Sequence, residues 1–115
     1  MQRDRVVKLI EWFVKAALRH ADAIEGMQEE MAALQVASLT KYYEALLAEE
    51  EGLQKLLLLL DDQNPYIAGM VAVYGLPQAP ELCRPVLVRL ATAPGLIGFR
   101  AQIALQRWDD GEWEQ

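Results

Sequence analysis

Residues that cross-link a chain or bind a metal are almost missing from this sequence. The 115 residues include one cysteine and one histidine, so an internal disulfide is excluded and a Cys/His zinc site lacks ligands. Serine and threonine are also scarce (Ser38, Thr40 and Thr92), and no stretch alternates apolar and polar residues as a half-buried strand does. The sequence therefore favours an all-α fold in a reducing compartment.

A membrane-spanning segment is missing as well. The longest apolar run, residues 67–76, is about half the length of the roughly 20 residues that cross a bilayer. Near the N-terminus, basic residues precede an apolar segment as in a signal peptide, but Glu11, Lys15 and Arg19 interrupt it every four residues. A signal peptide needs an unbroken apolar core of about 7–15 residues. We therefore expect an amphipathic helix here, no membrane partner and a cytoplasmic location.

The charge is acidic, with a formal net value of −6. Residues 1–64 carry seven Lys and Arg against twelve Asp and Glu, whereas residues 65–115 carry four against five. Nucleic acid is a poor ligand for such a chain, because phosphate neutralisation needs clustered positive charge. The same acidic field attracts a basic protein, although an acidic surface also serves solubility alone.

Residues 50–77 form the centre of the predicted organisation, as two helices joined by a tight turn. The first helix has leucines at the i, i+3, i+4, i+7 spacing of one helical face: Leu53, Leu56, Leu57 and Leu60. The second helix, residues 65–74, starts at Asn64-Pro65, because Asn accepts a hydrogen bond from an unpaired backbone N–H and Pro at the first position has none. Gly75 is expected to end it in a left-handed cap.

Four further helices are predicted over residues 4–24, 27–49, 81–91 and 97–108, with Gly26 as the break between the first two or as a bend in one longer hairpin. Pro85 removes a backbone donor inside the fifth helix, so we expect a late start or a kink there. Helical spacing predicts which residues of three of these helices face inward. They are Ala33, Val36, Leu39, Thr40, Tyr43, Leu46 and Leu47 in the second helix, Leu82, Val86, Leu87 and Leu90 in the fifth, and Phe99, Ile103 and Leu105 or Gln106 in the sixth.

No group of residues has the spacing of a catalytic, cofactor-binding or metal-binding site. Cys83 lies at helical spacing from apolar residues and is expected to be a small buried side chain, while His20 lies at the margin of the first helix's apolar stripe. Three adjacent acids, residues 49–51, allow a metal or acid–base interpretation. Carboxylates before a helix also complement its dipole, and we favour that interpretation. The sequence therefore predicts a protein that is not an enzyme.

The pair of central helices resembles a HEAT-type repeat, whose pattern of Asp, Pro and small apolar residues is matched by Asp62, Pro65, Ile67, Val71 and Ala72. Ala68 stands where the repeat usually has Arg. The whole chain looks like an uncharacterised bacterial family of short HEAT-like helical proteins, a domain of unknown function that is similar to HEAT-type immunity proteins. The resemblance implies a single domain over residues 1–115, a short HEAT/ARM-like right-handed helical solenoid of about six helices.

The resemblance implies a protein-binding module, most specifically an immunity protein (antitoxin) that neutralises a cognate, basic toxin domain. Aromatic anchors and surface carboxylates suit such a partner. The candidate partner-binding residues are Trp12, Tyr42, Glu49, Glu50, Asp61, Asp62, Tyr66 and Trp113. The alternative is a homo-oligomeric structural or scaffold protein, in which a second copy covers the open end of the solenoid. A monomer and a homodimer both remain open at this point.

Overall fold

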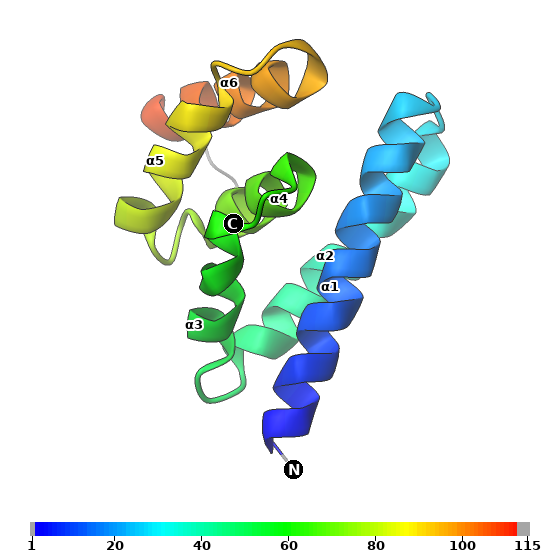
Figure 1. Cartoon of the computed structure of the whole chain (residues 1–115), viewed down its shortest axis with the longest axis vertical. Helices are drawn as coiled ribbons and strands as arrows, with labels where there is room; N and C mark the ends of the chain where they lie inside the picture. The colour runs from blue at the N-terminus through cyan, green and yellow to red at the C-terminus, as the bar shows by residue number, and fades with distance from the viewer. Residues whose placement is uncertain (1, 113–115) are drawn as a thin grey trace. The chain divides into compact units, whose positions relative to one another are not determined.

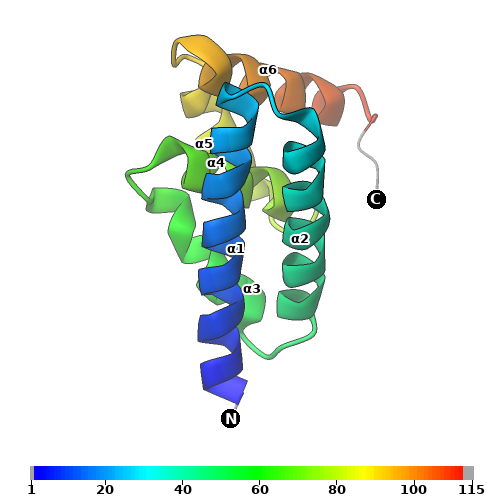
Figure 2. The ribbon, with the colours of Figure 1, turned by 90° about the vertical axis from the view of Figure 1, so that its right-hand side faces the viewer.

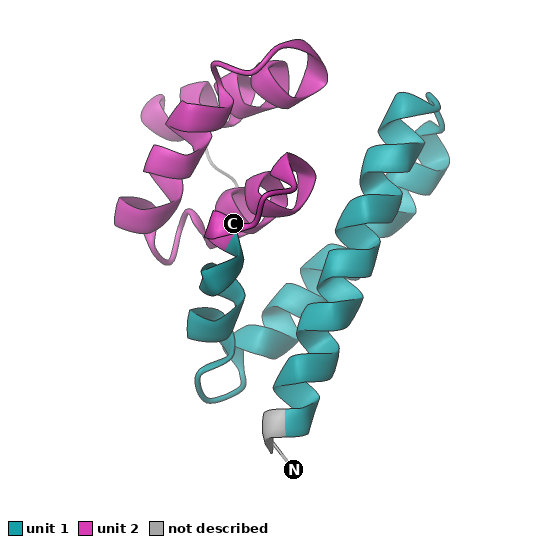
Figure 3. Cartoon of the chain, viewed as in Figure 1, with its two compact units in different colours: residues 1–59 teal, residues 60–115 magenta. Residues whose placement is uncertain are grey.

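The computed structural model describes residues 2–112, with side chains from residue 4 onward, and these residues form six α-helices and a 3₁₀ turn but no strand. The all-α prediction is therefore confirmed. The chain divides into two compact units, residues 1–59 and residues 60–115 (Figure 3). The prediction that residues 1–115 form a single domain is not tested by this division and stays a prediction. None of the described helices combines the length and apolarity needed to cross a membrane.

The first unit is built on an antiparallel hairpin of α1 (Gln2–Glu25) and α2 (Glu29–Leu47), which lie side by side in both views (Figures 1 and 2). The break predicted at Gly26 is confirmed, since the two helices are separate and Met27 adopts a left-handed conformation with φ of 57°. Phe13 and Leu39 are fully buried. His20, predicted at the margin of the stripe, is 5% exposed and belongs to this core.

The inward face of α2 differs from the prediction. Leu39, Tyr43 and Leu46 are buried as expected, but Val36 and Leu47 are more than two-fifths exposed. Both lie roughly 60–80° around the helix from Leu39, at about 100° per residue. The apolar stripe of the sequence is wider than the surface that α1 and α3 cover, so its edge stays outside.

The first unit continues into α3 (Gly52–Leu57), and a 3₁₀ turn, η1 (Leu58–Asp61), crosses from the first unit into the second. The residue before α3, Glu51, has a left-handed backbone with φ of 62°. Gly52 is buried, and a Cβ at this position would collide with the backbone carbonyl oxygen of Leu46. The tight turn between α2 and α3 therefore depends on this glycine.

The second unit contains α4 (Pro65–Gly75), α5 (Pro80–Leu90) and α6 (Gly95–Asp109), each of which contacts the other two. The predicted start of α4 is confirmed, because Oδ1 of Asn64 accepts a hydrogen bond from the Tyr66 N–H at 2.9 Å. The predicted left-handed cap at Gly75 is wrong. The helix ends at Gly75, the following Leu76 has right-handed geometry, and the Gly75 carbonyl accepts hydrogen bonds from the backbone N–H groups of Gln78 and Ala79.

Two features of α5 and α6 also depart from the sequence analysis. α5 starts at Pro80 and runs through Pro85, so the late start is wrong, and Leu82 is 51% exposed while its neighbour Cys83 is buried. α6 buries its small residues, Gly98, Ala101 and Ala104. Phe99 and Ile103, predicted to face inward, are 59% and 37% exposed.

The start of α6 lies close to the backbone of the turn before it. A Cβ on Gly98 would collide with the backbone carbonyl oxygen of Ala93, in the turn that leads into the helix. A helix surface this close to a neighbouring backbone accepts glycine and alanine but no large side chain. Leu96, Phe99 and Ile103 are on the outer face of α6, whereas Ile97, Leu105 and Trp108 are half-buried.

Candidate protein-binding face

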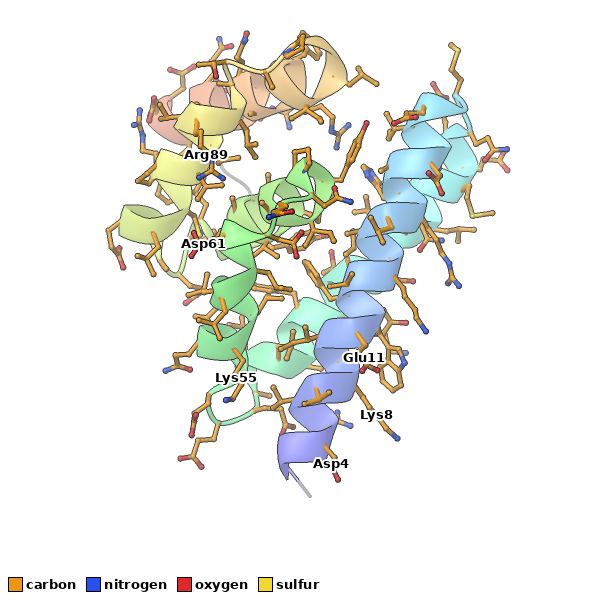
Figure 4. All side chains as sticks on the ribbon, viewed as in Figure 1. Asp4, Lys8, Glu11, Lys55, Asp61 and Arg89 are labelled. Atoms are coloured by element: carbon orange, nitrogen blue, oxygen red, sulfur yellow. The ribbon has the colours of Figure 1, made fainter. Side chains whose placement is uncertain are left out.

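Charged residues on α1 are sorted into two strips. From Asp4 onward, where side chains are described, α1 has four basic residues, Arg5, Lys8, Lys15 and Arg19, all exposed. At about 100° per residue, they fall within roughly 80° of the helix circumference. The acidic residues Asp4, Glu11 and Asp22 occupy the adjacent strip, and Figure 4 shows Asp4 and Lys8 pointing outward from the helix. The outer surface of α1 therefore has a basic side and an acidic side.

An aromatic pair lies on the basic side of α1. Trp12 contacts Tyr42 of α2 with ring centroids 5.8 Å apart and planes tilted by 42°. Trp12 remains 44% exposed, and Tyr42 is half-buried. An indole that is fixed by a neighbouring ring and still exposed offers a large contact surface with little conformational entropy to lose on binding.

An ion pair joins α1 to the turn that follows α2. Nε of Arg5 donates to Oε2 of Glu49 at 3.0 Å, and the Glu49 side chain is 16% exposed. The adjacent Glu50 and Glu51 are exposed at the turn into α3. Glu49 is therefore engaged in holding the hairpin, while Glu50 and Glu51 are open to a partner.

Four of the eight predicted partner-binding residues come together on this hairpin: Trp12, Tyr42, Glu49 and Glu50. We call the surface formed by Trp12, Tyr42, Glu50 and the four basic residues of α1 the hairpin face. Lys8, Lys15 and Arg19 were not among the predicted partner-binding residues. Their spacing around Trp12, alternately three and four residues, is visible in the sequence and identifies one strip of a helix.

The remaining predicted residues do not belong to the hairpin face. Asp61, Asp62 and Tyr66 lie in the second unit, and Trp113 is outside the described residues. Oδ1 of Asp62 accepts a hydrogen bond from the Asn64 N–H at 2.8 Å. Asp62 thus shapes the turn that leads into α4, and the half-buried Tyr66 follows in the first turn of that helix. Asp61 is exposed at the end of η1.

Outside the hairpin face, the buried Cys83 is a titratable group whose pKa is shifted. Burial, with a smaller effect from the Glu81 carboxylate, raises the pKa of the Cys83 thiol from 9.0 to about 11. The thiol is therefore protonated at neutral pH, and the prediction of a small buried side chain is confirmed. Among the described residues, no group of three or more His, Cys, Asp and Glu side chains is placed to hold a metal ion.

The chain has the fold of a bacterial protein of known structure. It is similar to the crystal structure of the protein RPA1889 from Rhodopseudomonas palustris CGA009, with a TM-score of 0.83 and 21% sequence identity over 96% of this chain and 93% of the other. No protein-family model matches the chain, and no curated protein matches it either. At this identity the likeness shows a shared all-helical fold and nothing about activity.

Proposed function

We propose that this chain is a non-enzymatic protein-binding module, and most specifically an immunity protein that binds and neutralises a cognate bacterial toxin through the hairpin face. The observation that carries the proposal is the Trp12–Tyr42 pair, which is ordered by its own contact and yet leaves the indole 44% exposed. Tryptophan and tyrosine are the side chains most enriched among residues that dominate binding energy. The immunity function rests on the resemblance to HEAT-type immunity proteins, and a short right-handed solenoid is part of the same proposal.

The charges of the hairpin face refine the partner that we propose. The net charge of −6 attracts a basic toxin domain at long range and accelerates encounter. Glu50 and Glu51 are open to its basic groups. Directly beside Trp12, however, the strip is basic, so a complementary partner places carboxylates there. We therefore propose a toxin domain that is basic overall and acidic where it meets Trp12.

The test is co-expression of the chain with the products of genes beside its own, followed by purification of any toxic product and measurement of the complex. We expect the chain to restore growth and to form a tight one-to-one complex. The double variant Trp12→Ala/Tyr42→Ala should weaken binding by about 100-fold, since each anchor contributes about 1–2 kcal/mol.

The matched control is Val7→Ala/Leu47→Ala. These two residues are 48% and 41% exposed on the same helices but lie roughly 140° around them from Trp12 and Tyr42. The control should bind within about threefold of the parent chain, as exposed residues outside an interface do. The proposal fails if no neighbouring gene product is neutralised, or if the aromatic double variant protects cells as well as the parent.

A homo-oligomeric scaffold is the second candidate. It is favoured by large apolar side chains that are strongly exposed, such as Leu34 at 61% and Leu58 at 72%, because a second copy would cover such residues. Light scattering over a range of concentrations distinguishes the two. A mass that rises to twice that of the chain supports the scaffold, and a constant monomer mass removes it.

A further inference from the structure

The inward face of α6 and two sets of polar contacts fix the orientation of this helix, and Ile97, Leu105 and Trp108 are half-buried. Gly98, Ala101 and Ala104 face inward, and the side chain of Gln102 donates a hydrogen bond to the Ala91 carbonyl oxygen at 2.9 Å. At the far end, Arg84 of α5 holds Asp109 by two hydrogen bonds, of 2.8 and 3.2 Å. The outer face of α6 is therefore presented in a defined orientation, although it contributes little to the core.

That outer face carries an apolar stripe. Leu96, Phe99 and Ile103 are 45%, 59% and 37% exposed and follow one another at i, i+3, i+7, the spacing of one helix face. Single exposed apolar residues are ordinary on protein surfaces, but a contiguous row marks a binding surface. The spacing matches what a second helix presents when it lies along α6.

Two guanidinium groups border this stripe. Arg100 and Arg107 are exposed and lie within roughly 40° of Leu96 around the helix. The acidic residues nearest to these arginines along the chain are at the C-terminal end of the helix, where Asp109 is bonded to Arg84 and Asp110 is exposed. Residues 95–108 contain none, so most of the stripe has a basic edge. We call Leu96, Phe99, Arg100, Ile103 and Arg107 the α6 strip.

The charges of the α6 strip decide between three occupants. A second copy that paired strip to strip would bring four guanidinium groups together; Asp109 is already bonded to Arg84, so each copy offers them only the Asp110 carboxylate from the end of α6. An anionic membrane would be repelled by Asp109, Asp110 and Glu112 at the end of the helix and by a net charge of −6. An amphipathic helix with carboxylates beside its apolar row matches both the apolar residues and the arginines.

We propose that the α6 strip is a second interaction surface, which binds an acidic amphipathic helix of another protein. Apolar residues of that helix cover Leu96, Phe99 and Ile103, and its carboxylates bond Arg100 and Arg107 in the bidentate geometry that guanidinium groups favour. The α6 strip belongs to the second unit, so this inference does not depend on the function proposed for the hairpin face.

The test uses the full chain and two designed helical peptides of about 20 residues. Both carry leucine at i, i+3 and i+7, and they differ only in having glutamate or lysine beside this row. Amide chemical shifts of the labelled chain locate the bound peptide. We expect the glutamate peptide to shift residues of α6 and to bind at least about tenfold more tightly than the lysine peptide.

Reversing the charges of Arg100 and Arg107 distinguishes specific recognition from non-specific hydrophobic binding. The double variant R100E/R107E should prefer the lysine peptide, which reverses the ratio of the two affinities. The triple variant L96Q/F99Q/I103Q should bind neither peptide while keeping the helical circular dichroism of the parent, because all three side chains are exposed. The control L82Q changes a residue of α5 that is 51% exposed and should leave both affinities unchanged within about twofold.

Three outcomes would overturn the inference. The first is equal affinity for both peptides, or shifts located outside α6. The second is a concentration-dependent dimer mass that the triple variant abolishes, which would identify a second copy as the occupant. The third is binding of the parent chain, but not the triple variant, to vesicles of phosphatidylserine and phosphatidylcholine.

Discussion

Trp12 and Tyr42 meet across α1 and α2 with ring centroids 5.8 Å apart, on the same edge of the hairpin where Arg5 bonds Glu49. Arg5 precedes Trp12 by seven residues on α1, which is two turns or about 10 Å, and Glu49 follows Tyr42 by seven residues, just beyond the end of α2. Both contacts therefore report one antiparallel register. A shift of α2 along α1 by a single residue would break the aromatic contact and the ion pair together.

This arrangement predicts energetic coupling between the two rings. Replacing Trp12 by Ala should lower the free energy of unfolding by about 1 kcal/mol, because a half-exposed indole loses only part of its burial. A double-mutant cycle with Tyr42→Ala should give a coupling of about 0.5–1.5 kcal/mol, as tilted aromatic pairs do. Urea denaturation of the four proteins measures it. Strictly additive losses would show that the contact contributes nothing.

The turn between α2 and α3 predicts opposite effects at adjacent positions. Gly52→Ala should destabilise the chain by about 2 kcal/mol or more, since the new methyl group collides with the Leu46 carbonyl oxygen. Glu51→Gly should stabilise it by up to about 1 kcal/mol, because Glu51 holds a φ of 62° that glycine adopts without strain. Thermal unfolding at one pH compares the two. A stable Gly52→Ala variant would contradict the close approach.

The buried thiol predicts a specific response to pH. With the pKa of Cys83 raised from 9.0 to about 11, a thiol reagent at pH 8 should label the folded chain at least about 100-fold more slowly than the chain unfolded in urea. Above pH 9 the unfolded chain loses a proton that the folded chain keeps. Stability should therefore fall as the pH rises from 9 to 11. Fast labelling of the folded chain would show that Cys83 is accessible.

The bidentate pair on the second unit predicts a shifted carboxyl titration. The hydrogen bonds from Arg84 lower the pKa of Asp109, and the Arg84→Gln variant should raise it back toward its ordinary value in a carboxyl NMR titration. The stability that this pair adds is present above that ordinary value and is lost as the pH falls through the lowered one. Both side chains are nearly half exposed, so the effect on stability is small. Arg89→Gln, on the same helix, serves as the control and should leave the titration unchanged.

The positions of the helices were predictable because residues next to their ends determine where each helix starts or stops. Asn64-Pro65 sets the start of α4, and the break near Gly26 separates α1 from α2. Such signals act within one turn of the chain, so a single sequence contains them. Gly75 is an exception, since α4 ends at this residue without the left-handed conformation that glycine allows, and the next residue, Leu76, has right-handed geometry.

The faces of the helices were harder to predict than their positions. Phe99 and Ile103 have the spacing of a core stripe, but the packing of α6 on α4 and α5 decides which of its faces is buried, and that packing is a tertiary property. In the hairpin face, too, candidate residues were predictable from the sequence but their contacts were not. Trp12 and Tyr42 were both candidates, yet their contact depends on a register set 15 residues away at the turn after α1. The basic strip needed only helical spacing and was within reach of the sequence.

The packing of α6 through Gly98, Ala101 and Ala104 has a consequence for how such a protein diversifies. Mutations at Leu96, Phe99 or Ile103 change the exposed surface of α6 and leave the packing of its buried face intact. Substitutions at Leu96, Phe99 and Ile103 are therefore constrained by the binding partners of the protein. Substitutions at Gly98, Ala101 and Ala104 are constrained by folding. A lineage could change its binding specificity many times on an unchanged scaffold.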